Sequence, residues 1–356
     1  MSEVRPERGA PVHPPPLAVA VGDPAGVGPL VSVRAALECA EGDRIVLFGD
    51  AERLTAMAGA EPGGRWTRVR RVEADAVKTL ELGEIGCVHV SDWDDAWVDR
   101  RGPTAEGGRA QLAVLDEATA SVRSRATRAL VTGPTSKDAI HHAGVPFVGQ
   151  TEHLATAAGM AKDAVTMMFL GPRLRVALVT THLAVRDVPD AIRAERVERT
   201  AVHAAEAVLR LAAAGDPAPR LVVTGLNPHA GERGMFGDEE ACAIFPGIER
   251  ARRQPPFAGG RAVLDGPLPA ETAFRQAAEG AWQGVVTMMH DQATIASKLL
   301  DWSRAVNVTW GLPFVRTSVD HGVAYDAAAR GEVEHAGMVA AMRMAQRLTA
   351  GGGSAS

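Results

Sequence analysis

LAVAVGDPAGVGP, residues 17–29, is the stretch that predicts the fold. Its first half, Leu17–Val21, is continuously apolar, as expected of a strand buried on both faces of a sheet. The glycines that follow indicate a tight turn, and Pro29 is typical of the first turn of a helix. A strand that passes through a short turn into a helix is the repeating unit of parallel α/β proteins.

The same alternation of strand and helix patterns recurs along the chain. Apolar runs predict further strands at 44–50, 87–93, 128–134, 165–170 and 174–182, and in the segments LVVTG, GVVTMMH and AVNVTW. Helical patterns predict helices at 109–122, about 195–214 and about 335–348. The sequence therefore predicts a mostly parallel sheet with helices on both faces.

Composition excludes several classes of protein. The chain has 356 residues, 46% of them hydrophobic, and a net charge of −5, so it can bury a large core and has no broad basic surface for nucleic acid. We expect no membrane span and no secretory signal. Three scattered cysteines favour a reduced, cytoplasmic setting. Residues 1–16 and 351–356 are expected to be disordered tails.

Three histidines follow runs that the pattern assigns to strands. His182 ends LRVALVTTH, His229 closely follows LVVTGL, and His290 ends GVVTMMH with Asp291 beside it. Ligands of parallel α/β folds bind beyond the carboxyl ends of the strands, so these side chains are candidates for one site. Three neutral imidazoles can hold a divalent metal and leave a position open for water or substrate. Taken singly, each also fits an ordinary structural histidine.

A second group of polar residues lies in DQATIASKLLDWSRAVNVTWGLPFVRTSVDHG, residues 291–322. Lys298, Arg304, Asn307 and Arg316 together suit a phosphate or a carboxylate. The alternative is a set of solvated surface charges. The apolar neighbours VNVTW and LPFV favour partial enclosure of Asn307 and Arg316 on buried strands.

Two further features have open interpretations. VGDPAGVGP has the spacing GxxxGxG between a strand and a helix, which is neither the Rossmann nor the P-loop pattern. Its glycines either approach a phosphate or only serve a tight turn. Asp320 and His321 either pair as an acid and its orienting partner or cap a helix that begins near Gly322.

The segment VTGPTSKDAIHHAGVPFVGQTEHLA, residues 131–155, also suggests a binding role. Lys137 is one of only four lysines in the chain and lies one turn into a predicted helix. Gln150, Thr151 and Glu152 precede a second helix, where a backbone N–H and the threonine hydroxyl can bind an anion. The alternative is that Thr151 only caps this helix.

The motifs GDPAGVGP, VTGPTSK, GQTE, THLAVRDVP, GLNPHAGE, GPLPAET, MHDQ and VNVTWGLPFVRTSVDHG occur in this order over nearly the whole chain. On these motifs the chain resembles the PdxA family, the 4-hydroxythreonine-4-phosphate dehydrogenases of pyridoxal phosphate biosynthesis. The resemblance implies two α/β/α lobes of the isocitrate/isopropylmalate dehydrogenase-like type with the active-site cleft between them. The first lobe would hold residues 17–136 and about 312–350, and the second about 137–311 with the metal ligands and dimer contacts.

The resemblance also implies a chemistry and a homodimer whose partner subunit completes the active site. The reaction would be NAD- or NADP-dependent oxidation of 4-phosphohydroxy-L-threonine at C3, followed by decarboxylation to 3-amino-2-oxopropyl phosphate. A divalent metal, commonly zinc, with magnesium, manganese or cobalt as alternatives, would be held by His182, His229 and His290. Family motifs place Gln150, Thr151, Glu271, Lys298, Asn307 and Arg316 at the substrate, and Asp291 and Lys298 are the candidate catalytic residues. The cofactor-binding residues stay unassigned.

Four departures from the family pattern concern the pocket. Gln150 replaces a histidine that contacts the substrate phosphate, so a neutral amide stands where a titratable ring is usual. Glu271 replaces an aspartate, and Ala293 replaces a glycine after HDQ. Arg233 and Met235 replace a small residue and a histidine, and Arg233 is a candidate to compensate for the charge lost at Gln150.

These departures leave other substrates and classes open. D-threonate or D-erythronate 4-phosphate is one alternative substrate, and an aromatic cis-dihydrodiol is a weaker one because Lys298, Asn307 and Arg316 are all present. A metal-dependent hydrolase or lyase without NAD is an alternative class. A catalytically idle metabolite-binding protein is a third, and the complete histidine set argues against it.

Overall fold

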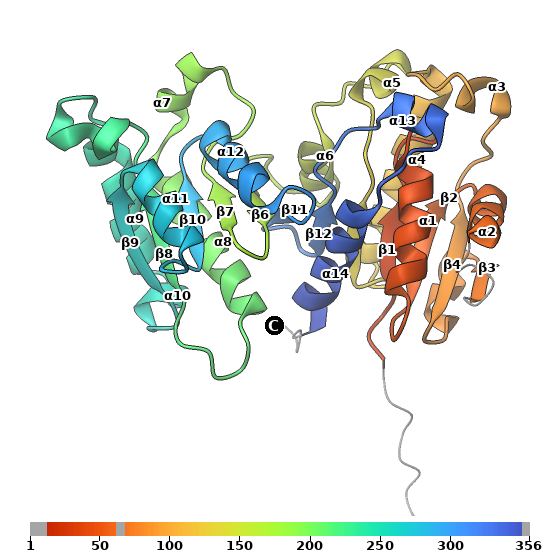
Figure 1. Cartoon of the computed structure of the whole chain (residues 1–356), viewed down its shortest axis with the longest axis horizontal. Coiled ribbons are helices and arrows are strands. Elements are labelled where there is room, and N and C mark those ends of the chain that lie inside the picture. The colour runs from red at the N-terminus through yellow and green to blue at the C-terminus, as the bar shows by residue number, and fades with distance from the viewer. Residues whose placement is uncertain (1–12, 62–67, 351–356) are drawn as a thin grey trace, which may run out of the picture.

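The structure, a computed structural model, describes residues 13–61 and 68–350. In this part of the chain twelve strands form one continuous sheet in the order β3-β4-β2-β1-β5-β12-β11-β6-β7-β10-β8-β9. The strands are β1 Leu17–Ala20, β2 Ile45–Gly49, β3 Arg68–Arg71, β4 Glu84–His89, β5 Ala129–Thr132, β6 Thr166–Leu170, β7 Arg175–Leu178, β8 Arg220–Thr224, β9 Val263–Leu268, β10 Gly284–Thr287, β11 Val306–Trp310 and β12 Val315–Ser318. The predicted α/β class is confirmed, and Figure 1 shows helices on both faces of the sheet.

Helices connect most of these strands. They are α1 Gly28–Cys39, α2 Ala51–Ala60, α3 Asp95–Val98, α4 Ala105–Arg123, α5 Lys137–His142, α6 Gln150–Ala157, α7 Val188–Ala191, α8 Ala194–Leu211, α9 Phe245–Arg252, α10 Pro255–Ala258, α11 Ala270–Ala278, α12 His290–Asp301, α13 Tyr325–Arg330 and α14 Ala336–Ala350. Short 3₁₀ segments are η2 Ala74–Thr79, η3 Val185–Asp187 and η4 Pro228–Gly234, and η5 Glu240–Ile244 is a π-helical turn.

Most strand pairs are parallel, but the centre of the sheet is not. β1 pairs in parallel with β2 and β5, and β10 pairs in parallel with β7 and β8. Between these groups, β11 pairs antiparallel with both β12 and β6, and β6 pairs antiparallel with β7 across the turn that contains Gly171 and Pro172. The antiparallel register of β11 and β12 sets Thr309 opposite Arg316 and Asn307 opposite Ser318. This register brings the side chains of Thr309 and Arg316, seven residues apart in the sequence, to one place.

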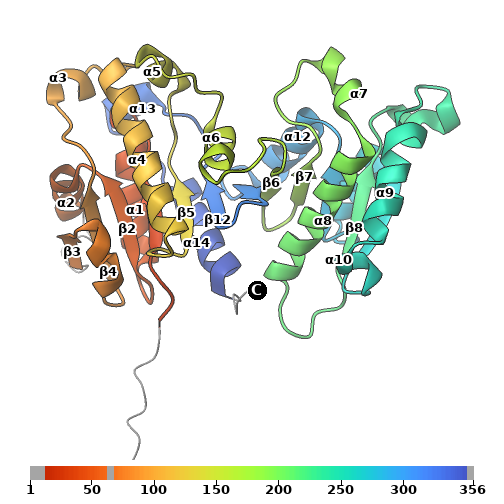
Figure 2. The ribbon, with the colours of Figure 1, turned by 180° about the vertical axis from the view of Figure 1, so that it is seen from behind.

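Helix layers explain why the inner strands are apolar without alternation. Every residue of β1 and β2 is buried, because α1 and α14 cover one face of this half of the sheet and α4 covers the other (Figures 1 and 2). In the other half, α8 and α9 lie on the face seen in Figure 2, and α11 and α12 lie on the opposite face. A strand enclosed on both faces gains from apolar side chains at every position.

The glycine-rich turn after β1 packs backbone against backbone. Gly22 has φ +86°, and a Cβ atom there would lie 2.2 Å from the Pro134 carbonyl oxygen. A Cβ atom on Gly28 would lie 2.2 Å from the carbonyl oxygen of Val21. Asp23 N–H donates to the Pro134 carbonyl across 3.0 Å. Of the two interpretations of these glycines, the structure supports the tight turn.

Several predicted boundaries move by a few residues. The helix expected near 195–214 is α8, Ala194–Leu211, and the one expected near 335–348 is α14. The helix expected to begin near Gly322 begins at Tyr325 after Ala324 in left-handed conformation, so the idea that Asp320 and His321 cap it is wrong. Residues 1–12 and 351–356 of the predicted tails lie outside the described residues. Among the helices that the structure describes, none has the length and apolar character needed to cross a bilayer.

Candidate active site

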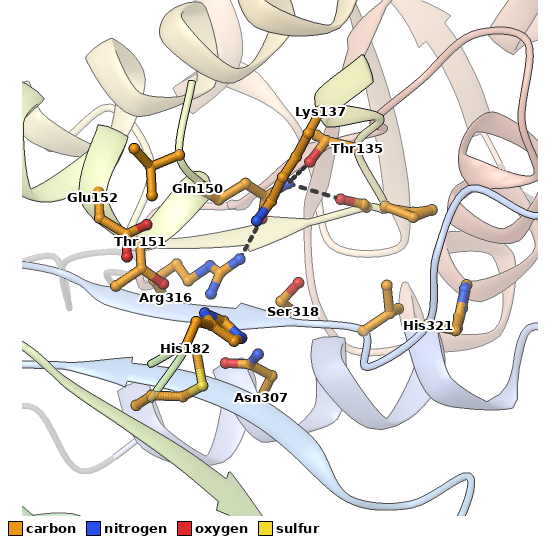
Figure 3. Close-up of a pocket in the computed structure, with 16 residues that line it drawn as sticks. Thr135, Lys137, Gln150, Thr151, Glu152, His182, Asn307, Arg316, Ser318 and His321 are labelled. Atoms are coloured by element: carbon orange, nitrogen blue, oxygen red, sulfur yellow. Dashed lines mark hydrogen bonds between the residues drawn. The ribbon is translucent and has the colours of Figure 1, made fainter. Parts of the chain in front are cut away.

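A pocket of about 190 Å³ lies where β5 and β12 end and where α5 and α6 begin (Figure 3). It contains members of three groups that the sequence singled out: a histidine, the buried-strand cation and amide, and the residues of the GQTE turn. The histidine, His182, lies four residues beyond β7, which ends at Leu178 and not at His182 as predicted. Its polar lining comprises Thr135, Lys137, Gln150, Thr151, Glu152, His182, Asn307, Arg316, Ser318 and His321. The position agrees with the rule that ligands bind beyond the carboxyl ends of parallel strands.

Arg316 forms the floor of this pocket. It is 3% exposed, and its guanidinium donates to the hydroxyl of Thr132 through Nε at 3.2 Å and Nη2 at 2.8 Å. Nη1 donates to the Thr309 hydroxyl at 3.0 Å, and Nη2 also donates to the Gln150 side-chain oxygen. Burial lowers the pKa of Arg316 to about 10, against a raising effect of Glu152, so the group keeps its charge at neutral pH. A buried cation with neutral hydrogen-bond partners is suited to an anionic ligand.

Asn307 lies beside this cation with an unused acceptor. Its Oδ1 atom is buried and has no hydrogen-bond partner among the described residues. A buried polar atom without a partner is costly, so a ligand that brings an N–H or O–H group here would remove that cost. The two residues that the sequence placed on buried strands therefore do meet in one pocket.

Thr151 and the start of α6 also line the pocket. α6 begins at Gln150 after Gly149, so Thr151 lies inside the helix and is not its N-cap residue. The Thr151 hydroxyl lies 3.4 Å from the hydroxyl of Thr309, which also binds Arg316. A hydroxyl in this position can reach a ligand that contacts Arg316.

Lys137 and Glu152 add charge to the pocket. α5 begins at Lys137, because the Ser136 side chain accepts a hydrogen bond from Ala139 N–H as the N-cap. Lys137 thus lies one turn earlier in its helix than the sequence predicted, and its side chain enters the pocket from the side opposite His182 (Figure 3). The sequence placed both residues in a segment with a binding role but assigned neither of them to the substrate. The scarcity of lysine was the sequence signal that pointed to Lys137.

Two of the three candidate metal ligands are neighbours. The rings of His182 and His290 have centroids 5.3 Å apart. Desolvation by burial lowers the pKa of His182, and the nearby His290 and Lys137 lower it further, so the neutral imidazole that binds metals prevails at neutral pH. Asp291 contacts Nδ1 of His290 at 2.9 Å, as a carboxylate that orients a metal-binding ring does.

His229 lies apart from this pair, on an unusual turn. Residues 229–233 within η4 all have positive φ, between 44° and 79°. Left-handed conformations cost non-glycine residues such as Ala230 and Glu232 roughly 1–2 kcal/mol each, and such strain is often found at functional sites. Among the described residues, no three His, Cys, Asp or Glu side chains are grouped closely enough to hold a metal.

A buried carboxylate stabilises the backbone just before this turn. Glu240 is 7% exposed and accepts hydrogen bonds from the backbone N–H groups of Leu226 and Asn227, both at 2.8 Å. It also accepts from the Asn227 side chain at 2.9 Å. Beside the turn, a hydrogen bond from the Thr272 hydroxyl lowers the pKa of Glu271, and the charge of His229 contributes to the shift. His229 and Glu271 therefore belong to one neighbourhood.

The remaining cations lie outside the pocket that contains Arg316. Lys298 pairs with Asp320 at 3.4 Å and lines a neighbouring cavity, while Arg304 is exposed and lines a third. The Arg316 pocket is not lined by Arg233, which is exposed on the left-handed turn. Burial raises the pKa of Asp320, and Lys298 opposes that shift. Adjacency in sequence did not bring Lys298 and Arg304 to the same place as Asn307 and Arg316.

The fold and the pocket together define an α/β protein with a buried cation, suited to an anionic ligand, at the carboxyl ends of its strands. Comparison with known proteins identifies the family. The family model described as pyridoxal phosphate biosynthetic protein PdxA matches residues 41–345. The chain belongs to the PdxA family.

Individual relatives agree with this assignment. A protein of Geobacter metallireducens named 4-hydroxythreonine-4-phosphate dehydrogenase is 39% identical over 347 residues, which cover 96% of this chain and 98% of that protein. The crystal structure of the Klebsiella pneumoniae protein of that name has a TM-score of 0.78 at 32% identity, covering 94% of this chain and 99% of the other. A protein of Halalkalibacterium halodurans, provisionally named D-threonate 4-phosphate dehydrogenase, is 34% identical and covers 94% of this chain and 96% of its own length. The chain is an oxidoreductase of this dehydrogenase family.

Proposed function

We propose that this chain oxidises 4-phosphohydroxy-L-threonine at C3 with NAD and releases CO₂ to form 3-amino-2-oxopropyl phosphate. The observation that carries the proposal is the buried Arg316, whose hydrogen bonds go to neutral oxygens of Thr132, Thr309 and Gln150. A guanidinium in that setting favours a dianionic phosphate as its counter-charge. The named relatives carry the same substrate in their names.

The rest of the pocket supports this substrate. The unpartnered Asn307 Oδ1 suits the amino or hydroxyl group of the substrate, and the Thr151 hydroxyl lies 3.4 Å from that of Thr309. Lys137 lines the pocket and provides a second positive charge there. These groups would hold the phosphate and the backbone of the substrate in one orientation, which is the condition for transfer of a hydride from C3.

We assign a divalent metal to His182, His290 and His229. The first two suit it by chemistry, because His182 favours its neutral form and Asp291 orients the His290 ring. The assignment of His229 rests on family membership and on its strained turn, since the described residues do not group the three side chains. When bound, the metal would stabilise negative charge that develops on the substrate oxygen during oxidation and during loss of CO₂.

We propose that NAD binds in the adjoining cavity. This cavity has a volume of about 550 Å³ and shares His321 with the Arg316 pocket. Ligand sites of this size are typical of cofactors and drug-sized molecules. Lys298, Trp302, Asp320 and Glu334 are among its lining residues. We propose that Lys298 lies at the border between cofactor and substrate. It would then not contact the substrate phosphate directly.

A second substrate is favoured by one specific observation. The relative provisionally named D-threonate 4-phosphate dehydrogenase matches nearly the whole chain at 34% identity. D-Threonate and D-erythronate 4-phosphates keep the phosphate and the hydroxyl but carry no amino group. The Asn307 acceptor can bind either a hydroxyl or an amino group, so it does not discriminate between these substrates.

NADH formation measured across a small substrate panel tests the proposal. The panel contains 4-phosphohydroxy-L-threonine, its dephosphorylated form, the two sugar-acid phosphates and an aromatic cis-dihydrodiol, each with zinc, manganese or magnesium. We expect the highest kcat/KM with 4-phosphohydroxy-L-threonine and a large loss for the dephosphorylated form. A higher value with a sugar-acid phosphate would reassign the substrate. Metal-dependent turnover without NADH would place the chain among hydrolases or lyases.

We also propose that the chain is a homodimer that buries the outer face of α12. Ile295, Leu299 and Trp302 are 62%, 81% and 74% exposed, and their spacing puts them on one side of the helix. An exposed apolar stripe of this kind marks an interaction surface. Because α12 begins at His290, a partner seated on this face would lie close to the metal ligands.

Leu299→Glu is expected to convert the dimer into a monomer, because it puts a charge in the middle of the apolar stripe. Light scattering after size-exclusion chromatography would show the mass fall by half, and NADH formation should fall at least about tenfold. Leu82→Glu is the matched control, since Leu82 is 46% exposed and lies near β4, far along the sheet. A monomeric parent protein, or a Leu299→Glu protein that stays dimeric, would contradict this interface.

A further inference from the structure

Gln150 contacts protein atoms with all of its hydrogen-bonding capacity. Its Oε1 accepts from the Thr132 hydroxyl at 2.8 Å and from Nη2 of Arg316. Its Nε2 donates to the Gly133 carbonyl at 3.0 Å and to the Thr135 hydroxyl at 3.3 Å. A side-chain amide has two acceptor sites and two donors, so no donor of Gln150 is left for a ligand. Figure 3 shows the amide between Arg316 and Thr135.

The orientation of this amide is determined by its surroundings. Turning it over would set the NH₂ group against the Arg316 cation and the carbonyl oxygen against the Gly133 carbonyl. Both contacts would be repulsive, so the oxygen faces the guanidinium. Gln150 therefore links the turn after β5, through Gly133 and Thr135, to the cation on β12.

The hydrogen-bond partners of Arg316 are neutral, so its positive charge is not compensated by them. Its four hydrogen bonds end on hydroxyl and amide oxygens, and Glu152 on α6 is a carboxylate whose charge acts on the guanidinium without a hydrogen bond to it. A guanidinium has five N–H groups, so these bonds leave one on Nη1 for a ligand. A neutral Gln150 holds the cation in place without neutralising it. A carboxylate in the same position would do both.

We propose that Gln150 is a positioning residue for Arg316 and not a direct ligand of the bound anion. It aims the remaining N–H of the guanidinium into the pocket and, being neutral, leaves the whole positive charge to the ligand. The proposal refines the substrate site of the proposed function and rests on it. It depends only on anion binding, so it can be tested without knowing the natural substrate.

The experiment is a double-mutant cycle with inorganic phosphate as the probe. Calorimetry on the full-length protein at one pH gives the Kd of phosphate for the parent, Gln150→Leu, Arg316→Lys and the double variant. If Gln150 acts through the guanidinium, Gln150→Leu weakens binding about tenfold in the parent, the range of a hydrogen bond to a charged group. In the Arg316→Lys background it changes binding less than about twofold, because the geometry that Gln150 sets is already lost.

Gln150→Glu supplies the charge test. The carboxylate would pair with Arg316, and we expect phosphate binding to weaken by roughly a hundredfold. Gln346→Leu is the matched control, because Gln346 is a half-buried glutamine on α14 that donates to Cys39 and Asp43 outside the pocket. Thermal unfolding of each variant separates lost folding from lost binding.

Three results would overturn the proposal. Equal, additive effects of Gln150→Leu in both backgrounds would make Gln150 a direct ligand. Unchanged phosphate affinity in Gln150→Glu would show that Arg316 does not hold the anion. A loss as large in Gln346→Leu would indicate a general effect on stability. If the cycle succeeds while 4-phosphohydroxy-L-threonine gives no NADH, the substrate assignment fails and the role of Gln150 stands.

Discussion

Arg316→Ala is expected to raise the KM for the phosphorylated substrate by about a hundredfold or more, the loss of a buried charge-assisted hydrogen bond. The guanidinium is 3% exposed and is the one cation on the floor of the described pocket. Its removal also leaves the hydroxyls of Thr132 and Thr309 without their donor. Steady-state kinetics with phosphorylated and dephosphorylated substrate would measure the effect, which should be confined to the phosphorylated one.

Arg304→Ala is the matched control for this variant. Arg304 lies near Arg316 in the sequence but is exposed and lines a different cavity. We expect its KM to match that of the parent protein. If Arg304→Ala has the larger effect, or if Arg316→Ala binds phosphate normally, the site assigned here is wrong. Circular dichroism would confirm that the Arg316→Ala protein is folded, and Arg316→Lys offers a less disruptive substitution.

His229→Ala is expected to abolish metal binding and NAD reduction together. Removal of a group that only supports a metal ligand lowers metal affinity by roughly 10–100-fold. Removal of a direct ligand should therefore lower it by more than about a hundredfold. Metal content after dialysis and direct titration with zinc would measure binding independently of activity. Substitution of His182 should have the same consequence, since its ring lies next to that of His290.

His335→Ala is a suitable control. The His335 ring lies 3.4 Å from the carboxylate of Glu38, which is on α1, and His335 is outside the pocket that His182 lines. It should keep the metal and the activity of the parent protein. Full NADH formation by the parent protein in metal-free buffer would refute the metal site. Unchanged zinc affinity in His229→Ala would exclude His229 alone and leave His182 and His290 as ligands.

Local patterns in the sequence were enough to predict the α/β architecture. LAVAV is buried at every position because helices cover both faces of its strand, and continuous apolarity is the local sign of that environment. The same logic placed Asn307 and Arg316 on inner strands from the runs VNVTW and LPFV. Those two residues lie in one pocket because β11 and β12 pair with each other and with the strands on either side.

Other parts of the site depend on contacts between distant segments. Lys298, Arg304 and Asn307 are close in sequence, yet they lie on α12, on the loop after it and on β11, and they line three different cavities. Helical and turn geometry separates side chains that a linear grouping joins. The sequence also predicted a ligand role for Gln150, and its four bonds to protein atoms became visible only when β5, α6 and β12 were assembled.

The left-handed turn at residues 229–233 is the feature that the sequence predicts least. Nothing in the local preferences of HAGER predicts five consecutive residues with positive φ, since alanine, glutamate and arginine disfavour that region. The buried Glu240 receives the backbone N–H groups just before the turn, and it comes from a later π-helical segment. The sequence alone determined the α/β layers, the family and the residue types of the site, because burial patterns and motifs can be recognised within short segments of sequence. The tertiary structure decided which of those residues share a pocket and which backbone carries strain, because both depend on contacts between segments far apart in the chain.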